Sequence, residues 1–387
     1  MSSGTANGYW QGKALPSVFK HELLRRYIPP FGGMTGTQAQ DRRVVYLDGY
    51  AGEGRYENGD PGSAEIAMRV ASYYRTRGLR LACYFVEQQP KSFERLQQVL
   101  GGYTARGVDA RAHRGEVDEV LDDVVRRAAG VPLFLFLDPC GLCLPRERLV
   151  DVLARQRRER RPATELLMNF SMMAVRRLGG HVRSPKGNER SLERFDAVCG
   201  GPWWREYFAD DADDQEDAAE AVAAEYARRL HQLTGMFVQS VPVAKAPHLK
   251  PVYHLVFATR SPYGLWVFGD AVARARAEWW KTLELQAEEA DPNALFSAVS
   301  VLRPDPETVE KAAVPVMAAN LERLLRQGRP VKLVDHTLEL FGSYYGQVTE
   351  PVARKAVKYL HGEGKTPSTG IGEKRTRELV VNPPART

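Results

Sequence analysis

Short runs of apolar residues alternate with helical stretches through the first half of the chain. The apolar runs lie at 44–47, 81–86, 133–137 and 166–170. They are continuous rather than alternating in polarity, which is typical of strands buried on both faces of a parallel sheet. Residues between them repeat with helical spacing at 65–76, 92–100 and 145–160. The pattern predicts an α/β fold with a doubly wound, mostly parallel sheet.

The pattern changes after residue 170. Two strand candidates, GMFVQSVPV and PVYHLVFAT, follow each other across a proline-containing turn, and 264–285 reads as a long helix. A hairpin placed so late is unlike a dehydrogenase sheet. It is typical of the partly antiparallel closing edge of a Rossmann-like methyltransferase sheet. We therefore predict one Rossmann-like domain over 41–290.

The two ends of the chain predict helical additions to this domain. Residues 19–28 have helical spacing, and we expect that helix to stop at Pro29-Pro30, because proline lacks the N–H that a helix needs. A glycine-rich loop would follow, within an N-terminal extension over 1–40. Residues 314–375 read as three helices and a hairpin-like GEGKTPSTG stretch. This order predicts a winged-helix-like module and basic tail over 300–387.

Positive charge is concentrated near the C-terminus. The net charge is +6, and residues 323–387 hold 12 Lys and Arg against 6 Asp and Glu. Arg354, Lys355 and Lys358 would share one side of a helix, since positions three and four apart are neighbours. Such a face can contact nucleic acid. The alternative is an ordinary solvated helix face.

Composition sets the compartment that we expect. The 387 residues include only four cysteines and no run of about 18 uncharged apolar residues. So few thiols favour a reducing cytoplasm over a disulfide scaffold, and no secretory signal is visible in MSSGTANGYWQGK. Cys140 and Cys143 form a single C-x-x-C pair without further ligands, so we expect no metal site.

The first apolar run ends in Asp48 and leads into a glycine-rich turn, Asp48–Gly54 or D-G-Y-A-G-E-G. A glycine turn after a buried strand lets a ligand approach backbone N–H groups. The carboxylates of Asp48 and Glu53 would repel a pyrophosphate but can pair with a cationic group. The turn therefore favours S-adenosyl-L-methionine over NAD as cofactor. A purely structural loop is the alternative.

Two further acids extend this site. Glu87 ends the second strand, where a carboxylate can accept hydrogen bonds from both ribose hydroxyls. Glu116 and Asp118 follow the third strand–helix unit, where an acid that binds adenine would lie. Each of these acids alone is more often a charge at a helix start.

The fourth and fifth strands end in candidate catalytic residues. Asp138, followed by Pro139, lies at the carboxyl edge of the sheet, where open α/β sheets bind ligands. Its carboxylate can orient a nucleophilic amino group toward a methyl group. Asn169 ends strand five and can line the same site, or it can simply form a turn. The basic stretch 176–194, with Arg176 and Arg177, is a candidate substrate lid or a disordered loop.

Several segments together resemble the three-Cys-motif partner protein (TcmP) family. They are KHELLRRYI, YLDGYAGEGRYENGDPGSAEIAM, YFVE, FLFLDPCGL, ELLMNF and VYHLVFATRSPYGLWVF, within residues 17–285. The resemblance implies an S-adenosylmethionine-dependent methyltransferase fold and a separate partner of the radical-SAM type that bears a three-cysteine motif.

The resemblance also assigns residues. The cofactor end would comprise Asp48, Gly49, Ala51, Gly52, Gly54, Arg55, Gly62 and Ser63. The substrate side would comprise Pro139 and Gly141 beside Asp138, together with Arg55 and Tyr56. Cys140 departs from the pattern, because an aromatic residue is expected there. That departure weakens any base-stacking role at this position.

Three functions remain open at this point. The first is an S-adenosylmethionine-dependent methyltransferase that acts on nucleic acid, which the basic C-terminal segment and the D-P after strand four favour. The second is a methyltransferase for a small molecule or a modified peptide in a biosynthetic pathway, working beside the radical-SAM-type partner. The third is a binding partner without catalytic activity that keeps the fold.

Overall fold

A computed structural model describes residues 14–139, 141–158, 161–184, 188–209, 215–290 and 302–384. The chain forms two compact units. The first unit contains Ile28–Arg260, and the second contains Val18–Tyr27 together with the segment that starts at Ser261. The boundary between Arg260 and Ser261 follows directly after a strand of the sheet.

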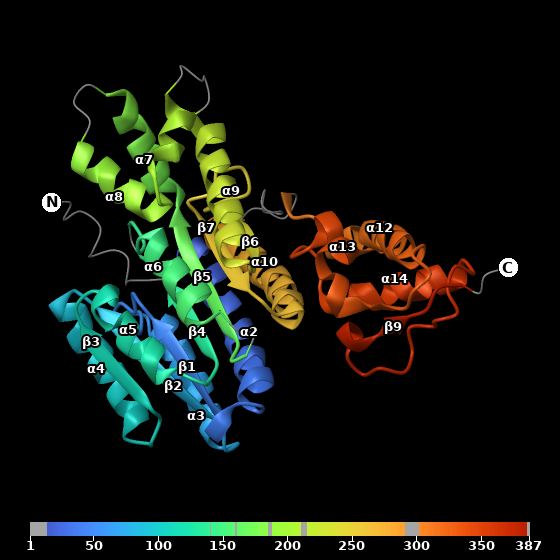
Figure 1. Ribbon diagram of the computed structural model, residues 1–387, viewed down its shortest axis with the longest axis horizontal. Coiled ribbons are helices and arrows are strands. Elements are labelled where there is room, and N and C mark those ends of the chain that lie inside the picture. The colour runs from blue at the N-terminus through green and yellow to red at the C-terminus, as the bar shows by residue number, and fades with distance from the viewer. Residues whose placement is uncertain are drawn as a thin grey trace. The chain divides into compact units, whose positions relative to one another are not determined.

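The first unit is built on a sheet whose described strands run in the order β3-β2-β1-β4-β5-β7-β6 (Figure 1). Five strands are parallel: β1 Arg43–Asp48, β2 Arg80–Glu87, β3 Ala110–Arg114, β4 Leu133–Leu137 and β5 Thr164–Ser171. β7 (Tyr253–Thr259) lies antiparallel to both β5 and β6 (Phe237–Val243). This arrangement confirms the predicted α/β fold with a Rossmann-like, mostly parallel sheet and an antiparallel closing hairpin.

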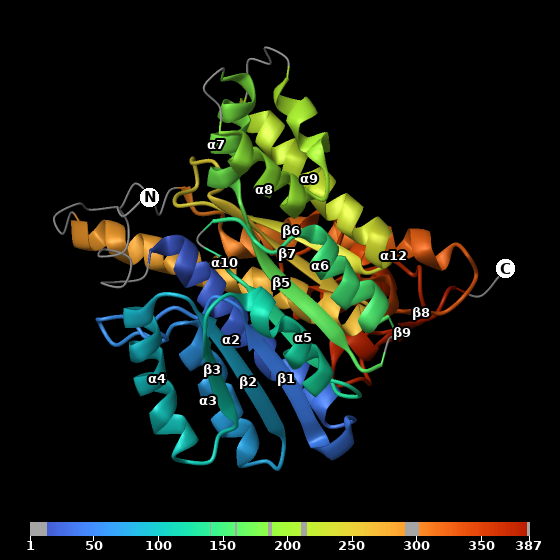
Figure 2. The same cartoon turned by 60° about the vertical axis from the view of Figure 1, so that its left-hand side comes forward.

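Helices cover both faces of the sheet (Figures 1 and 2). On one face α3 packs against α4 and β2. Its bounds and those of α4 are Ser63–Arg75 and Pro90–Thr104. The other face is covered by α5 Val117–Arg127, α6 Arg146–Val150, the π-helix Asp151–Gln156, α7 Met172–Arg183, α8 Glu189–Cys199, the 3-10 helix Pro202–Phe208 and α9 Gln215–Thr234. The helix predicted over 145–160 is thus divided into α6 and a π-helix.

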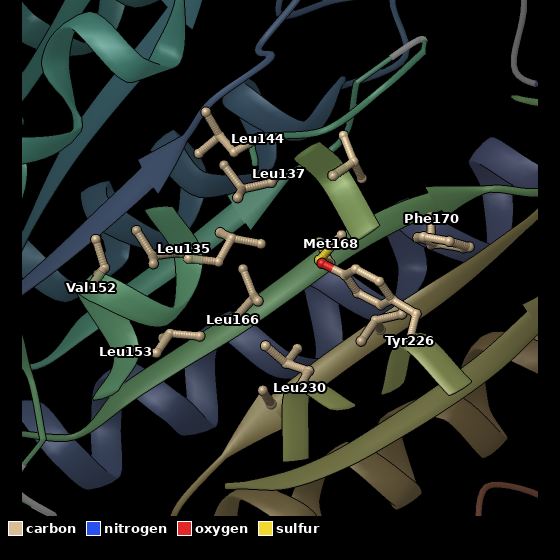
Figure 3. Close-up of a cluster of buried hydrophobic side chains, with 14 of the residues drawn as sticks. Leu135, Leu137, Leu144, Val152, Leu153, Leu166, Met168, Phe170, Tyr226 and Leu230 are labelled. Atoms are coloured by element: carbon tan, nitrogen blue, oxygen red, sulfur yellow. The ribbon is translucent and has the colours of Figure 1, made fainter. Parts of the chain in front are cut away.

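The core on this second face follows from the alternation of side chains along the strands. Every second residue of β4 and β5, from Leu133 to Phe170, enters one hydrophobic cluster with α6 and α9 (Figure 3). Phe170 and Tyr226 stack with ring centroids 4.7 Å apart. The Tyr226 hydroxyl lies 3.7 Å from the Met168 sulfur. Burial on both faces explains why these strands read as continuous apolar runs.

The prediction that the first helix stops at Pro29-Pro30 is wrong. Helix α2 runs over Leu15–Gly36 with both prolines inside it. Tertiary packing compensates for the missing N–H groups, because Phe31 packs on Phe134 with centroids 5.4 Å apart. The Tyr74 hydroxyl donates to the Pro29 carbonyl. A Cβ at Gly32 would lie 2.7 Å from the Tyr74 ring, so glycine permits this approach.

The basic stretch 176–194 is not a loop over its described residues, and that prediction is also wrong. It lies in α7 and α8, and its residues 185–187 fall outside the described residues. The Ser171 hydroxyl caps α7 by accepting from the Ala174 N–H at 3.2 Å. Buried Val175 and Leu178 lie on the inner face of that helix. The N-cap and the apolar inner face thus stabilise a helix in this stretch despite its many basic residues.

The second unit is helical. Its helices include α10 Pro262–Ala290, α12 Pro306–Leu325, α13 Thr337–Phe341 and α14 Glu350–Gly362, with 3-10 helices Leu333–His336, Gly342–Tyr344 and Thr376–Glu378. β8 (Val331–Lys332) pairs antiparallel with β9 (Val380–Val381). The hairpin expected at GEGKTPSTG is wrong, because this stretch forms no strand. The winged-helix assignment remains a prediction.

Contacts within this unit engage most of its predicted basic face. The Arg354 guanidinium donates to the carbonyls of Gly370 and Glu373 at 2.5 and 2.6 Å. Lys355 is ion-paired with Glu310. These side chains therefore hold α14 to neighbouring segments, while Lys358 stays exposed. Among the described helices, none combines the length and apolar character needed to cross a membrane.

Candidate functional site

Three acids and one amide lie together at the carboxyl edge of the sheet. These residues are Asp48, Glu87, Asp138 and Asn169, at or near the ends of β1, β2, β4 and β5. The residue before each of them belongs to the core on the α5–α9 face, so all four side chains lie on the opposite face. The strand order reverses between β1 and β4, which is where open α/β sheets bind ligands. We call this group the carboxyl edge.

Asp48 is fully buried at the end of β1. Its Oδ1 accepts a hydrogen bond from the Tyr50 backbone N–H at 3.2 Å. The Gly49 and Ala51 N–H groups donate to the carbonyls of Phe136 and Val86 at 2.9 and 2.8 Å. The start of the glycine turn is thus fixed to the two neighbouring strands, and its backbone is preorganised.

Glu87 ties the second strand to the same turn. Its Oε2 accepts from the Gly52 N–H at 3.0 Å and its Oε1 from the Gln89 N–H at 2.7 Å. Partial burial raises the pKa of the Glu87 carboxyl, and the bonds from Gln89 and Gly52 oppose this rise only in part. The carboxylate therefore stands half-buried at the position expected for a ribose-binding acid.

The protein's own packing accounts for much of the glycine content of this turn. Gly52 and Gly54 have φ angles of 60° and 78°, a region that other residues avoid. A Cβ at Gly49 would lie 2.7 Å from Leu137, and one at Gly62 would lie 2.9 Å from the Gly54 carbonyl oxygen. Packing within the protein therefore explains several of these glycines, as the alternative of a structural loop predicted. The argument for a ligand depends on the acids instead.

Asp138 and Asn169 are joined across neighbouring strands. The Asn169 Nδ2 donates to the Asp138 Oδ1 at 2.9 Å. Asn169 is 8% exposed, and its Oδ1 accepts no hydrogen bond from any residue that the structure describes. Below them, burial raises the pKa of the Tyr46 phenol, and the charges of Asp48 and Asp138 raise it further.

The remaining predicted cofactor and substrate residues differ in burial and in their partners. Ser63 is the buried first residue of α3. Pro139 is buried and Gly141 half-buried, and a Cβ at Gly141 would meet open space. Glu116 is exposed, and its Oε1 accepts from the Gln88 amide at 3.4 Å. Asp118 instead pairs with Arg148 at 2.7 Å.

Two of the three predicted substrate-binding arginines make hydrogen bonds to other groups of the chain. Arg176 donates to the Pro251 carbonyl at 2.8 Å, and Arg177 is exposed on α7. Arg55 makes two hydrogen bonds to Glu65, at 2.6 and 2.7 Å. Tyr56, next to Arg55, is buried. Sequence position alone could not reveal the partners of these arginines.

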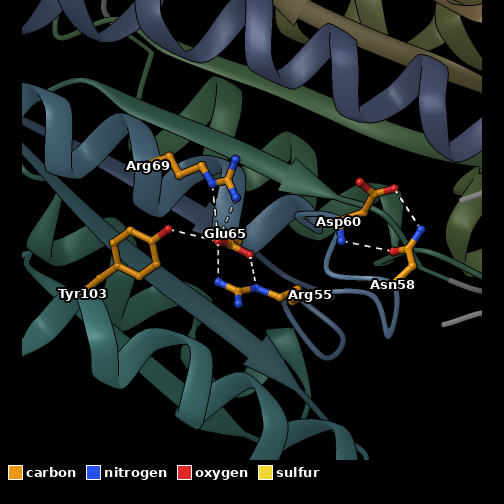
Figure 4. A network of polar contacts seen from close by, with 6 residues as sticks. All are labelled: Arg55, Asn58, Asp60, Glu65, Arg69 and Tyr103. Carbon is orange, nitrogen blue, oxygen red and sulfur yellow. Dashed lines mark hydrogen bonds and ion pairs between the residues drawn. The ribbon is translucent and has the colours of Figure 1, made fainter. Parts of the chain in front are cut away.

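Glu65 is the centre of a polar network that sequence reasoning missed (Figure 4). It is 1% exposed and accepts hydrogen bonds from Arg55, Arg69 and Tyr103. Burial by itself would raise the pKa of the Glu65 carboxyl, but these donors outweigh burial and lower it. The only sequence signal was an acid on the otherwise apolar inner face of α3.

Tyr50 and Cys143 also lie beside the site and were not predicted. Both pack on the edge of the large core. Burial raises the pKa of the Cys143 thiol to about 12, so this thiol is not ionised at neutral pH. Cys140 lies outside the described residues. Within the described ranges, no group of three or more His, Cys, Asp or Glu side chains is arranged to hold a metal ion.

Comparisons with known proteins return similar structures but no family. No protein-family model matches the chain, and no curated protein matches it. The small RNA methyltransferase HEN1 is 12% identical, with a TM-score of 0.34, over 64% of this chain and 26% of that chain. The present chain thus spans about a quarter of that protein's length.

Two further structures cover similar shares of the chain. An O-methyltransferase from Bacillus cereus, in complex with SAH, is 11% identical with a TM-score of 0.29, over 62% of this chain and 80% of that one. The O-methyltransferase TomG from Streptomyces achromogenes, in complex with SAM, is 14% identical with a TM-score of 0.27, over 65% and 92%. Because these TM-scores are low, our fold assignment depends on the strand order and register described above.

Proposed function

We propose that this protein is an S-adenosyl-L-methionine-dependent methyltransferase. The observation that carries the proposal is the placement of Asp48, Glu87, Asp138 and Asn169 on one face of the sheet edge, around the point where the strand order reverses. Oxygen acceptors at this edge suit a cofactor that carries an ammonium, a sulfonium and a ribose diol. They do not suit a pyrophosphate.

The residues present fit such a cofactor. The half-buried Glu87 carboxylate would accept the ribose hydroxyls, and its backbone hydrogen bonds already fix its orientation. The Asp48 carboxylate supplies negative charge at the end of β1, and the backbone of Ala51 and Gly52 borders the same turn. When bound, the cofactor would supply an electrophilic methyl group on a sulfonium.

Asp138 and Asn169 would then position the methyl acceptor. The Asn169 Oδ1 is a buried acceptor without a hydrogen bond, and an unsatisfied buried acceptor is costly unless a ligand supplies a donor. The linked Asp138 carboxylate holds the amide in this orientation. Together these groups would accept hydrogen bonds from an amino group and direct its lone pair, which is catalysis by positioning.

For the acceptor, we place nucleic acid first and a small molecule or modified peptide second. The positive net charge of +6 supports a polyanion. The second candidate rests on the likeness to the TcmP family, and Cys140 favours it, because it stands where an aromatic residue would stack on a base. In that case a radical-SAM-type protein with a three-cysteine motif would be the partner.

Calorimetric titration with S-adenosylhomocysteine tests the proposal. We expect the parent protein to bind it and Glu87→Gln to bind at least tenfold more weakly, because the ribose hydroxyls lose a charged acceptor. Glu206→Gln, an exposed change on the 3-10 helix Pro202–Phe208, is the matched control and should bind like the parent. Binding of NADH or ATP in place of S-adenosylhomocysteine would contradict the cofactor assignment. A parent that binds none of them would indicate the third function, a partner without catalytic activity.

A further inference from the structure

A cavity of about 550 Å³ lies between the glycine turn and α4. Its lining includes three guanidinium groups, from Arg55, Arg95 and Arg106, two phenol rings, from Tyr56 and Tyr103, and the carboxylates of Glu53 and Glu57. None of these residues belongs to the carboxyl edge. We call this cavity the arginine cleft, and its size is within the range of pockets that bind small ligands.

Two of the arginines are held in place by carboxylates. Arg55 is fixed by its two bonds to the buried Glu65. Arg95 donates to the Glu53 carboxylate at 2.5 Å. A guanidinium has five N–H donors, so each of these groups keeps donors for a ligand after making its bonds. Their orientation is therefore set before any ligand binds, which lowers the entropic cost of binding.

Arg106 differs from the other two. Its guanidinium lies 4.9 Å from the centre of the Tyr103 ring, and it forms no ion pair with any described residue. The Tyr103 hydroxyl donates to Glu65 at 3.0 Å, so the ring under the guanidinium is also fixed. The cleft thus presents a planar cation that no carboxylate neutralises.

The same pairing of arginine and tyrosine recurs at the C-terminal end of α3. The Arg77 guanidinium lies 4.4 Å from the centre of the Tyr73 ring, and Tyr73 is 51% exposed. Arg75 lies close to the segment that follows α4, because a Cβ at Gly107, the residue after Arg106, would lie 3.0 Å from the Arg75 Nε.

This combination matches one class of ligand. Guanidinium groups recognise phosphate through paired N–H donors. Bases of single strands stack on tyrosine rings and on guanidinium planes. An acidic peptide would use the charges but would leave the aromatic surface without a role. A single nucleotide with its phosphate suits the size of the cavity.

We propose that the arginine cleft binds a nucleotide of a single-stranded nucleic acid, with the phosphate on Arg95 and Arg106 and the base against the Arg106–Tyr103 stack. This proposal rests on the proposed methyltransferase function, for which the bound strand is the acceptor. One nucleotide of the acceptor strand would thus be held on one side of the glycine turn, while the cofactor and the methyl-accepting group lie at the carboxyl edge on the other.

The test is the binding of a fluorescein-labelled 12-nucleotide single-stranded RNA, measured by fluorescence anisotropy at several salt concentrations. We expect Arg106→Ala to weaken binding about five- to tenfold and to reduce the slope of log affinity against log salt by somewhat less than one, because one phosphate contact is lost. Arg158→Ala changes an exposed arginine near the amino end of β5 and is the matched control, with binding unchanged. Arg106→Lys should recover the slope and only part of the affinity, because lysine keeps the charge but not the planar stack.

The result separates the two proposals. Loss of RNA binding in Arg106→Ala with unchanged S-adenosylhomocysteine binding supports the cleft. If Arg106→Ala and Arg158→Ala weaken RNA binding equally, or if polyglutamate displaces RNA as well as unlabelled RNA does, the cleft proposal is wrong. The parent could also fail to bind S-adenosylhomocysteine while its RNA binding still depends on Arg106. That result would overturn the methyltransferase function but support the cleft as a nucleic-acid site.

Discussion

The two sides of the glycine turn hold different sets of charged groups. On one side lie the acids of the carboxyl edge, Asp48 and Glu87, with Asp138 nearby. On the other side lie the three guanidiniums of the arginine cleft, together with two carboxylates. One short segment takes part in both, because the Gly52 N–H donates to Glu87 while Glu53, the next residue, accepts from Arg95. A cationic cofactor and an anionic acceptor could therefore be bound close together without competing for the same groups.

The two sides are also built differently. At the carboxyl edge, backbone N–H groups and burial fix the carboxylates. In the cleft, ion pairs to the buried carboxylates of Glu65 and Glu53 fix guanidiniums that are themselves partly exposed: Arg55 and Arg95 are 47% and 53% exposed. Buried groups are screened weakly by salt, and exposed charges strongly. The comparison therefore predicts different responses to mutation, salt and pH.

The largest effect should come from Asp138→Ala. We expect the rate of methyl transfer to single-stranded RNA to fall about 100-fold, because the acceptor and Asn169 lose their positioning partner. Affinity for S-adenosylhomocysteine should stay within twofold, since Glu87 and the glycine turn are unchanged. Single-turnover transfer of a labelled methyl group measures the rate, and calorimetry measures the affinity. An equal loss of both would mean that Asp138 supports the fold rather than the reaction.

The next largest effect concerns stability. Glu65→Ala removes the common acceptor of Arg55, Arg69 and Tyr103 and should lower the free energy of unfolding by about 2 kcal/mol. Urea denaturation followed by circular dichroism measures it. Glu94→Ala, at an exposed position on α4, is the control and should change stability by less than about 0.5 kcal/mol. If both variants unfold alike, the network does not organise the cleft.

Salt should separate the two sites by about sevenfold. With two phosphate contacts, from Arg95 and Arg106, affinity for single-stranded RNA should fall about sevenfold between 50 and 200 mM salt. Affinity for S-adenosylhomocysteine should change less than twofold over the same range, because its partners are buried or half-buried. Parallel anisotropy and calorimetry titrations give both values. If the affinity for RNA does not depend on salt, the proposal that the cleft binds nucleic acid is wrong.

The smallest effect should be on pH dependence. The pKa of Glu87 is raised, so its carboxylate begins to take up a proton at higher pH than an ordinary glutamate. Only the charged form accepts both ribose hydroxyls, so S-adenosylhomocysteine should bind a few-fold more weakly as pH falls from 7 toward 5. Glu87→Gln should show a flat profile.

Glu65 provides the contrast across the turn. Its pKa is lowered, so its ion pairs stabilise the folded state above the ordinary glutamate pKa and are lost only as pH falls through the lower folded value. The stability that Glu65 contributes should therefore persist over the range in which cofactor binding weakens. Loss of stability and of binding at the same pH would contradict this assignment.

The sequence by itself determined the parts whose character is local. The strands β1, β2, β4 and β5 are buried on both faces, so each left a continuous apolar run, and the acids at their ends could be read directly. The late hairpin, whose strand β7 is buried along its whole length, predicted the antiparallel edge. By contrast, β3 (Ala110–Arg114) is a half-exposed edge strand without a buried residue, and it left no such run.

Only the tertiary structure decided the contacts between distant segments. Proline at 29 and 30 breaks a helix by local rules, yet packing of Phe31 on Phe134 keeps α2 continuous. Arg55 looked like a substrate ligand until Glu65, ten residues away, proved to hold it. Asn169 and Asp138 are joined over 31 positions. Local sequence patterns indicate which residues are buried and where the chain turns. Side-chain pairing depends instead on which surfaces the fold brings together, and those surfaces come from segments far apart in the sequence.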